Sequence, residues 1–312
     1  MRIVLALGGN ALLERGEALT AENQLNNIKK AAASIAKIAK NNELVIVHGN
    51  GPQVGLLMEQ NAAYNEVSPE TTPYPMDVLG AQTCGMVGYM LQKELLNVDS
   101  CLGVVSLLTQ TVVNKEDEAF NNPTKFVGPV YSKERAEEIM ADTGVMFKAD
   151  GEYYRRVVAS PTPHNIIELY QIEALLKQKS IVIAGGGGGV PVAYDSKGIE
   201  LTGVECVIDK DSTACLMSKL LDADMFIILT DGAVYEDFGK PSQRAIQKIS
   251  STELKTYDFP AGSMGPKVDA VCDFVDKTSR SAAIGSLFEL DEILRGEAGT
   301  HITDRAELTY YL

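Results

Sequence analysis

The chain has 312 residues, of which 45% are hydrophobic and 22% are charged, and its formal net charge is −14 at pH 7. This composition is ordinary for a globular protein, and the length suits one large domain or two moderate ones. The acidic balance argues against a nucleic-acid backbone or an anionic membrane as partner, because both are bound by clustered lysine and arginine side chains. Phosphorylated ligands remain possible, because local lysines, helix N-termini and a divalent cation could bind their phosphate groups.

The cysteines lie in apolar surroundings and form no C-x-x-C pair; they are Cys84, Cys101, Cys206, Cys215 and Cys272. This pattern is typical of buried thiols in a reducing compartment and not of a disulfide or zinc framework. The chain starts with a strand-like apolar run that lacks the basic segment of a signal peptide, and no apolar run reaches the length of a membrane span. We therefore expect a cytoplasmic protein.

The first third of the chain repeats a strand, a glycine turn and a helix. Residues 3–7 form an apolar run that ends in a GGN turn, and a helical pattern follows over about 21–40. A second apolar run, 44–47, leads into a GNG turn. Further helices are predicted over about 54–64 and 76–96, and a strand over 103–107. This rhythm predicts a doubly wound, mostly parallel sheet with ligands at the carboxyl ends of its strands.

The pattern changes over residues 111–160, which are polar and alternate in short pieces. Residues 126–130 and 153–158 have strand character, so we interpret the stretch as an inserted subdomain or lid. The α/β rhythm then returns. It predicts a helix over 165–177, strands over 181–184 and 225–229, a helix ending near 276 and a last strand over 282–285.

The stretch from 203 to 221 is the most informative one. A β-rich run, 204–208, ends in Asp209, Lys210 and Asp211, and an apolar helical face follows. A lysine held where a strand turns into a helix suits anion binding, because free N–H groups and the positive end of the helix dipole converge there. Asp209 could hold Lys210 through a charge-assisted contact, cap the helix, or do both. We interpret this stretch as the centre of a phosphoryl-transfer site.

Two more lysines and three glycine clusters are candidates for the same site. Lys125 follows Pro-Thr in the insert, and Lys267 follows Gly-Pro at a helix start, where a cation opposes the dipole unless an anion lies between them. The glycine clusters, at 8–9, 49–51 and 185–189, follow apolar runs. Each one alone fits a tight turn, but three together favour an anion site.

Several common sites are disfavoured. No G-x-x-x-x-G-K-[ST] motif is present, and the run 185–189 fits only part of G-x-G-x-x-G. A P-loop NTPase, a protein kinase and a Rossmann dehydrogenase are therefore disfavoured. His48 precedes a glycine turn and could touch a ligand, although a packed or capping role fits it equally well. No Ser-His-Asp set or metal-ligand spacing is present, so we expect any metal to be Mg²⁺ brought by a nucleotide.

The motifs LALGGNAL, HGNGPQVG, NPTKFVGP, YRRVVASP, GGGGGVPV, VIDKD, FGKP and GSMGPKV follow one another along the chain. In this combination they are highly specific, and the sequence resembles the carbamate kinases of the amino-acid kinase superfamily over about residues 3–303. The resemblance implies an open αβα sandwich with a mostly parallel central sheet, formed by one domain over 1–312. It also implies an acceptor-binding half, 1–200, with a protruding lid subdomain at 111–160, and a nucleotide-binding half, 201–312.

The resemblance further implies a homodimeric kinase for reversible phosphoryl transfer between ATP and carbamate, with Mg²⁺ on the nucleotide and ATP often formed during arginine breakdown. By residue match, the acceptor and the transferred group would be bound by Gly8, Gly9, Asn10, Gly49, Asn50 and Gly51. The catalytic residues would be Lys210 and Lys267 for charge neutralisation, Asp209 for orienting the lysines and Lys125 for lid closure. The nucleotide would lie near Lys210, Tyr235, Met264, Gly265 and Lys267. Carbamate is already an anionic nucleophile, so no general base is required.

The chain departs from the family pattern at several positions, among them Gln82, Cys84, Phe126 and Gly265, and none of these removes a charged catalytic candidate. Two other functions stay open. One is another acylphosphate-forming kinase of the superfamily, acting on a carboxylate such as that of an amino acid. The other is a non-catalytic sensor or a partner subunit of a carbamoyl-transfer complex. The four charged candidates together favour an active enzyme.

Overall fold

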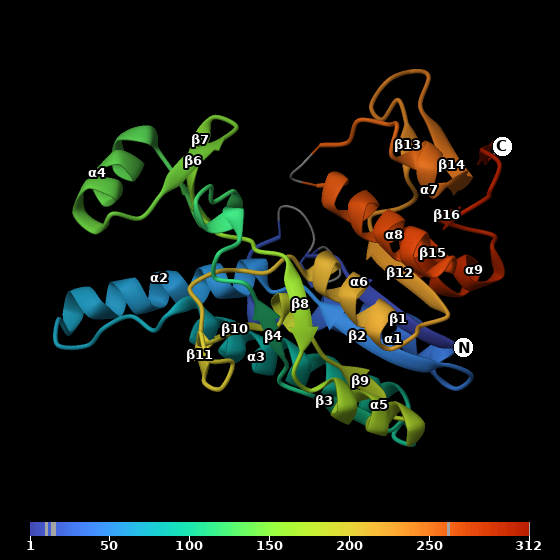
Figure 1. Cartoon of the computed structure of the whole chain (residues 1–312), viewed down its shortest axis with the longest axis horizontal. Helices are drawn as coiled ribbons and strands as arrows, with labels where there is room; N and C mark the ends of the chain where they lie inside the picture. Colours follow the sequence, from blue (N-terminus) through green and yellow to red (C-terminus); the bar gives the residue numbers. More distant parts are fainter. Residues whose placement is uncertain (10–11, 14–16, 261–262, 312) are drawn as a thin grey trace.

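The structure is a computed structural model that describes residues 1–9, 12–13, 17–260 and 263–311. Across these residues, ten strands form a large and mostly parallel sheet, as the sequence predicts (Figure 1). From edge to edge, its strands are β13 (Tyr235–Glu236), β14 (Arg244–Ser250), β16 (Thr300–Thr303), β15 (Ser281–Ser286), β12 (Met225–Thr230), β1 (Arg2–Leu7), β2 (Glu43–His48), β9 (Ile181–Ile183) and β3 (Val104–Ser106). The tenth strand, β17 (Thr309–Tyr310), pairs with β14 in antiparallel orientation.

Helices cover both faces of this sheet. The helices of the described residues are α1 (Ala21–Ala39), α2 (Gly51–Val67), α3 (Met76–Val98), α4 (Lys133–Thr143), α5 (Leu169–Lys177), α6 (Lys210–Leu220), α7 (Ser251–Leu254), α8 (Gly265–Thr278) and α9 (Leu290–Arg295). Of these, α1, α3 and α9 pack on one face of the central sheet, and α5, α6, α7 and α8 pack on the other. Polar side chains begin several of them, because the first N–H groups of a helix lack partners within it. Thr20 accepts a hydrogen bond at the start of α1 and Ser132 does so at the start of α4.

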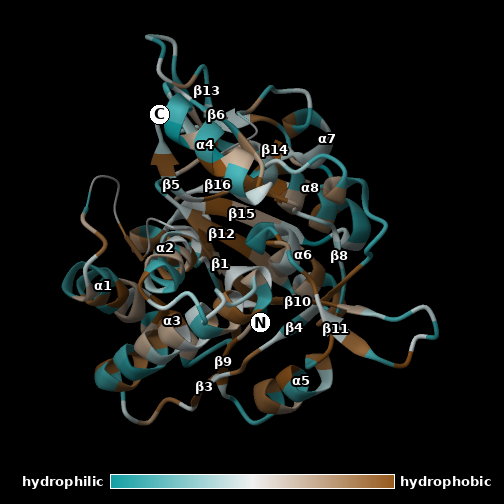
Figure 2. Cartoon of the chain, turned by 90° about the vertical axis from the view of Figure 1, so that its left-hand side faces the viewer, coloured by the Kyte–Doolittle hydropathy of each residue, from teal (hydrophilic) through white to brown (hydrophobic). Residues whose placement is uncertain are grey.

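The central strand β1 shows how the layers are held together. Val4 and Ala6 point into one hydrophobic core, which α5, α6, α7 and α8 complete, whereas Ile3 and Leu5 point into a second core with α1, α3 and α9. Both faces of the sheet are therefore buried, which is typical of parallel sheets. Figure 2 shows the hydrophobic strands between helices whose outer faces are more hydrophilic. The predicted open αβα sandwich is confirmed.

Two smaller sheets branch from the central one. A four-stranded sheet contains β11 (Leu201–Gly203), β10 (Val190–Tyr194), β4 (Gln110–Val113) and β8 (Pro163–Ile166), in that order. A three-stranded sheet contains β5 (Lys125–Tyr131), β7 (Tyr153–Val158) and β6 (Phe147–Asp150). With α4, the three-stranded sheet projects away from the central sheet at the upper left of Figure 1. The two strands predicted inside the insert are confirmed as β5 and β7.

Three element predictions were wrong. The run 204–208 is not a strand, because the N–H of Cys206 turns back to donate to the carbonyl of Val204 at 2.9 Å. The helix predicted from 165 begins only at Leu169, since the residues before it pair with β4 as strand β8. The strand over 282–285 is present as β15, but it is not the last one, because β16 and β17 follow it.

Within the described ranges, no helix combines the length and the hydrophobicity that a membrane span requires.

Candidate active site

The turns after β1 and β2 open the candidate site at the carboxyl edge of the sheet. The N–H of Gly8 donates to the carbonyl of Leu229 in β12 at 2.8 Å, and a Cβ on Gly8 would lie only 2.7 Å from that oxygen. A side chain there would force β1 and β12 apart. In the described structure, the Cβ positions of Gly9 and Gly51 have no neighbouring atom within 4 Å, so these two turns leave open space.

Asp209 fixes the start of α6 and contacts the projecting sheet. Its Oδ1 accepts hydrogen bonds from the N–H groups of Asp211 and Ser212, at 3.0 and 3.2 Å, so the predicted capping role is confirmed. Its Oδ2 accepts a hydrogen bond from Lys125 Nζ at 2.5 Å, across 84 residues of sequence. The carboxylate of Asp209 therefore pairs with Lys125 of β5, and not with Lys210 as the charge-assisted alternative had it.

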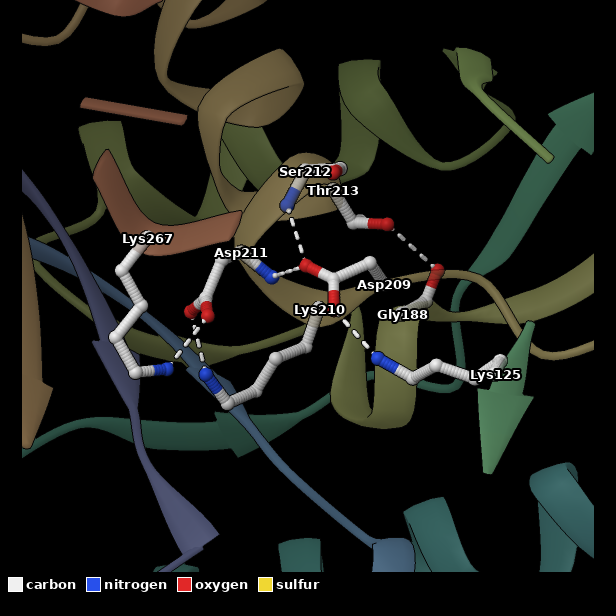
Figure 3. A network of polar contacts seen from close by, with 8 residues as sticks. All are labelled: Lys125, Gly188, Asp209, Lys210, Asp211, Ser212, Thr213 and Lys267. Carbon is white, nitrogen blue, oxygen red and sulfur yellow. Dashed lines mark hydrogen bonds and ion pairs between the residues drawn. The ribbon is translucent and has the colours of Figure 1, made fainter. Parts of the chain in front are cut away.

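Asp211 is the carboxylate that holds the other two lysines, and the sequence analysis assigned it no role. One oxygen contacts Lys210 Nζ and the other accepts from Lys267 Nζ, which is 2.8 Å away (Figure 3). The side chain of Asp211 is only 4% exposed. One buried aspartate thus aligns a lysine from α6 with a lysine from the first turn of α8. Its place beside Lys210 in VIDKD was the signal that could have identified it.

Burial and charge act against each other in this cluster. Burial opposes the charged form of Asp209, but Lys125 and Lys210 outweigh it and lower the pKa of Asp209 to about 2. For Asp211, burial again opposes ionisation, and Lys210 and Lys267 lower its pKa below the ordinary value. Burial lowers the pKa of Lys210, and Lys267 adds to this effect while Asp211 opposes it. A bound anion would favour the charged form of Lys210.

Lys210 also packs on the turn after β2. A Cβ on Gly49 would lie 3.5 Å from the Cδ and Cε atoms of Lys210, so the aliphatic part of the lysine covers this glycine. Asn50 lies next to it and donates from Nδ2 to Thr83 Oγ1 of α3 at 2.8 Å. Both Asn50 and Thr83 are buried. The structure therefore brings Gly49, Lys210, Lys267 and Lys125 to one end of the sheet, whereas predicted residue Asn10 lies outside the described residues.

The five-glycine run 185–189 packs behind this site. A Cβ on Gly186 would lie 2.3 Å from His48 Nε2, and one on Gly187 would lie 2.2 Å from Asn50 Nδ2. Four of the five glycines, among them Gly187, have positive φ, which favours glycine. The hydroxyl of Thr213 donates to the carbonyl of Gly188 at 2.9 Å. These contacts support the tight-turn interpretation of the run more than an anion site.

His48 is a buried residue at the carboxyl end of β2. It is 1% exposed, and its Nδ1 lies 2.9 Å from the carbonyl of Gly49, to which it donates. Burial and the nearby Lys210 lower the pKa of His48 to about 4, so the ring is neutral at pH 7. The packed role, and not ligand contact, agrees with this environment.

We expect His48 to make the fold sensitive to acid. The unfolded chain binds a proton at its histidine near pH 6.5, and the folded chain does so only near pH 4. Between these values the unfolded state holds more protons, so the free energy of unfolding should fall as the pH drops from about 6.5 to about 4, by an amount on the order of 3 kcal/mol. Chemical denaturation at several pH values measures this fall.

His48→Gln is the control for this prediction, because it removes only one titrating group. Burial also lowers the pKa of His301, and its contribution cancels between the wild type and the variant. The stability curve of the variant should be flatter over the same pH window. Parallel curves for the two proteins would contradict the assignment.

The predicted nucleotide residues lie in two places. Met264 precedes α8 as its N-cap, Gly265 is the first residue of that helix and Lys267 is in its first turn. The N–H of Gly265 donates to the carbonyl of Pro260 at 3.0 Å, and a Cβ there would lie 3.2 Å from that oxygen. Tyr235 is on the separate strand β13.

Two cavities of the described structure are lined by residues outside the lysine cluster, which consists of Lys125, Lys210 and Lys267. The larger one, about 840 Å³, is at the opposite end of the central strands and is lined by residues such as Arg2, Asn42 and Gly103. The smaller one, about 440 Å³, lies beside α8 and includes Gly265 and Tyr257. We place the candidate site by its charges and strand ends, because phosphate recognition depends on donors and cations more than on an enclosed apolar cavity.

The carboxylates of the site do not form a metal centre of their own. In the part of the chain that the structure describes, no group of three or more histidine, cysteine, aspartate or glutamate side chains could hold a metal ion. Both oxygens of Asp211 already contact lysines, and those of Asp209 contact Lys125 and two N–H groups. These oxygens fit cation and N–H partners and leave little capacity for a resident Mg²⁺.

A parallel αβα sandwich with lysines and a helix N-terminus at the carboxyl edge of its sheet defines a class of α/β proteins that bind anionic ligands there. The model of the amino acid kinase family matches residues 1–286. The carbamate kinase of Haemophilus influenzae is 52% identical over the full length of both chains, and that of Rhizobium meliloti is 49% identical over 100% of this chain and 96% of its own. The structure of carbamate kinase from Giardia lamblia bound to AMP-PNP superposes with a TM-score of 0.88 at 38% identity, covering 97% of this chain and 98% of the other. The chain belongs to the amino acid kinase family, and within it to the carbamate kinases.

Proposed function

We propose that the chain catalyses reversible phosphoryl transfer between ATP and carbamate, giving ADP and carbamoyl phosphate. The observation that carries the proposal is the pair Lys210 and Lys267, which share the buried carboxylate of Asp211 at the carboxyl edge of the sheet. Two carbamate kinases are 52% and 49% identical to this chain over its full length, and this similarity supports carbamate as the acceptor.

The chain's residues would act by positioning and by neutralising charge. Phosphoryl transfer requires an in-line arrangement and a stabilised charge on the transferred group, with little covalent chemistry by the protein. The ammonium groups of Lys210 and Lys267, fixed by Asp211, would face the phosphate oxygens. The open space at Gly9 and Gly51 would admit carbamate and the transferred group without steric conflict. Since a carbamate oxygen is already negative, no side chain needs to remove a proton.

Mg²⁺ would enter with the nucleotide as part of the substrate. The site's carboxylates are engaged with lysines and N–H groups, so the ion would be held mainly by phosphate oxygens and water, as Mg²⁺ often is. When bound, it supplies further neutralisation of the phosphate charge. The chain itself would align the lysines and exclude water from the site.

The direct test is ATP formation from ADP, Mg²⁺ and carbamoyl phosphate, followed with a hexokinase-coupled assay. We expect ATP release that depends on all three components. Folded protein that binds ADP but forms no ATP above the blank would contradict the proposal. It would favour a kinase for another carboxylate acceptor, or a sensor.

Lys125 gives a second prediction, because it is on the projecting sheet and contacts Asp209 at the helix start. We propose that this sheet is the lid that closes over the phosphates. Lys125→Ala should lower kcat and raise KM, with a smaller effect on kcat than the loss of Lys210, since a lid acts on both constants. Steady-state kinetics with varied ADP and varied carbamoyl phosphate measures both.

Lys148→Ala is the matched control in the same sheet. Lys148 is in β6 and its ammonium group donates to Asn122 Oδ1 at 2.9 Å, without contact to the lysine cluster. Its kinetic constants should equal those of the wild type. Equal losses in the two variants would mean that Lys125 acts only through the stability of the projecting sheet.

We also propose the organisation that the resemblance implies. The acceptor half would be residues 1–200, with the lid inside it, and the nucleotide half 201–312, in a single catalytic domain. Assembly as a homodimer, use in arginine breakdown with net ATP formation, and a cytoplasmic location belong to the same proposal. The location is supported by the cysteines, all of which are free thiols, four of them buried.

A further inference from the structure

The C-terminal strand, β17, lies beside the hairpin that β13 and β14 form, and Tyr235 is in the first strand of that hairpin. Strand β17 pairs with β14, with Tyr310 opposite Ile246, and the N–H of Tyr311 donates to the carbonyl of Ala245 at 3.0 Å. Strand β13 pairs with the preceding part of β14, Tyr235 being opposite Ala245. Figure 1 shows the C-terminus next to this hairpin. The model of the amino acid kinase family matches residues 1–286, so strand β17 lies outside the matched residues.

The side chain of Tyr310 reaches the hairpin through Glu236. Its hydroxyl donates to Glu236 Oε2 at 3.0 Å, and its ring stacks under the guanidinium of Arg244, with the Cζ atom 3.9 Å from the ring centroid. Arg244 also donates to Glu236 from Nε at 3.2 Å. These donors, Arg244 first, lower the pKa of Glu236, so the group is an anionic acceptor at neutral pH.

Glu236 also contacts the segment that leads into α8. The hydroxyl of Tyr257 lies 3.4 Å from Glu236 Oε1, and the ring of Tyr257 stacks on Phe259 with centroids 6.2 Å apart. The chain then continues to Met264 and Lys267 at the start of α8. One carboxylate therefore joins the strand of Tyr235 to the segment that carries the other nucleotide candidates.

We infer that Tyr310 is a positioning residue for the nucleotide site. Through Glu236, it holds β13 and the segment before α8 in the relative placement that an adenine nucleotide requires. The inference rests on the proposed function, because that proposal is what places the nucleotide near Tyr235 and Met264. Tyr310 itself touches neither the lysine cluster nor the transferred group, so its effect falls on nucleotide affinity.

The test is the dissociation constant of MgADP, measured by calorimetry without carbamoyl phosphate, together with steady-state kinetics. Tyr310→Ala loses both the hydroxyl and the ring, and it should weaken MgADP binding and raise the KM for ADP by roughly tenfold. The KM for carbamoyl phosphate and kcat should stay near the wild-type values. Tyr310→Phe retains the ring on Arg244 and should recover part of the affinity.

Thr309→Ala is the matched control in the same strand. The hydroxyl of Thr309 contacts Gln247 at 3.4 Å and not Glu236, so MgADP affinity should not change. Unchanged MgADP affinity in both Tyr310 variants, an equal loss in Thr309→Ala, or a uniform loss of kcat and of both KM values would overturn the inference. So would a wild type that does not bind MgADP. If the wild type binds MgADP but forms no ATP, the proposed function fails and this inference stands or falls on the affinities.

Discussion

Lys210→Ala should lower kcat for ATP formation by roughly 100- to 1,000-fold, the size found when one preorganised donor to a developing charge is removed. The side chain of Lys210 is only 13% exposed, its ammonium group is fixed by Asp211, and its aliphatic part covers Gly49. The removal of this cation leaves Lys267 as the remaining lysine of the pair that Asp211 aligns. Steady-state kinetics in both directions of the reaction measures the loss.

The matched control is Lys219→Ala, on the last turn of the same helix. Lys219 pairs with Asp273 of α8 at 2.5 Å and lies outside the lysine cluster. Its loss should leave kcat within about twofold of the wild type, as is usual for a partly exposed ion pair. Wild-type kcat in Lys210→Ala, with an unchanged circular dichroism spectrum, would refute the proposed role of Lys210.

Asp211→Asn should impair both the reaction and the fold. The substitution keeps the shape of the side chain but removes the negative charge between two lysines that are 13% and 16% exposed. Breaking a buried ion pair from one side costs about 3–5 kcal/mol, because the partner charge stays buried. The free energy of unfolding, measured by denaturant titration, should fall by this order, and kcat should fall with it because the lysines lose their alignment.

Asp273→Asn separates this effect from a general loss of charge. Asp273 is about half exposed and pairs with a single lysine, so its substitution should change stability by less than about 1 kcal/mol. If Asp211→Asn were as stable as Asp273→Asn and turned over at the wild-type rate, the shared carboxylate would have no role in aligning the lysines.

The layered architecture could be predicted from the sequence because each part of it has a local cause. Apolar runs of five and four residues that end in glycine turns became β1 and β2, and most of the polar insert became a separate sheet with α4. The failures share a different cause. The run 204–208 alternates like a strand, but it turns back on itself at Cys206, and the segment before Leu169 became β8 because β4 offered a partner. Strand pairing is decided by distant segments, which local patterns do not encode.

The charged residues of the site could be predicted from the sequence, but the ion pairs between its lysines and aspartates could not. The positions of Lys125, Lys210 and Lys267 in unusual contexts identified the cations. The sequence could not tell which aspartate would meet which lysine, because Asp209 and Asp211 are neighbours in the chain and separate only when the helix start directs them to different sides (Figure 3). Asp209 turns toward β5, whereas Asp211 turns toward α8.

The contacts that build the site also determine when it can exist. Gly8 is fixed by Leu229, Lys125 by Asp209, and Lys267 by Asp211, across 221, 84 and 56 residues of chain. Contacts of such long range form slowly, because the intervening chain must lose its freedom first. During synthesis, the lysine cluster therefore stays unassembled until α8 has been made and docked on α6, because a nascent chain that ends before α8 lacks Lys267.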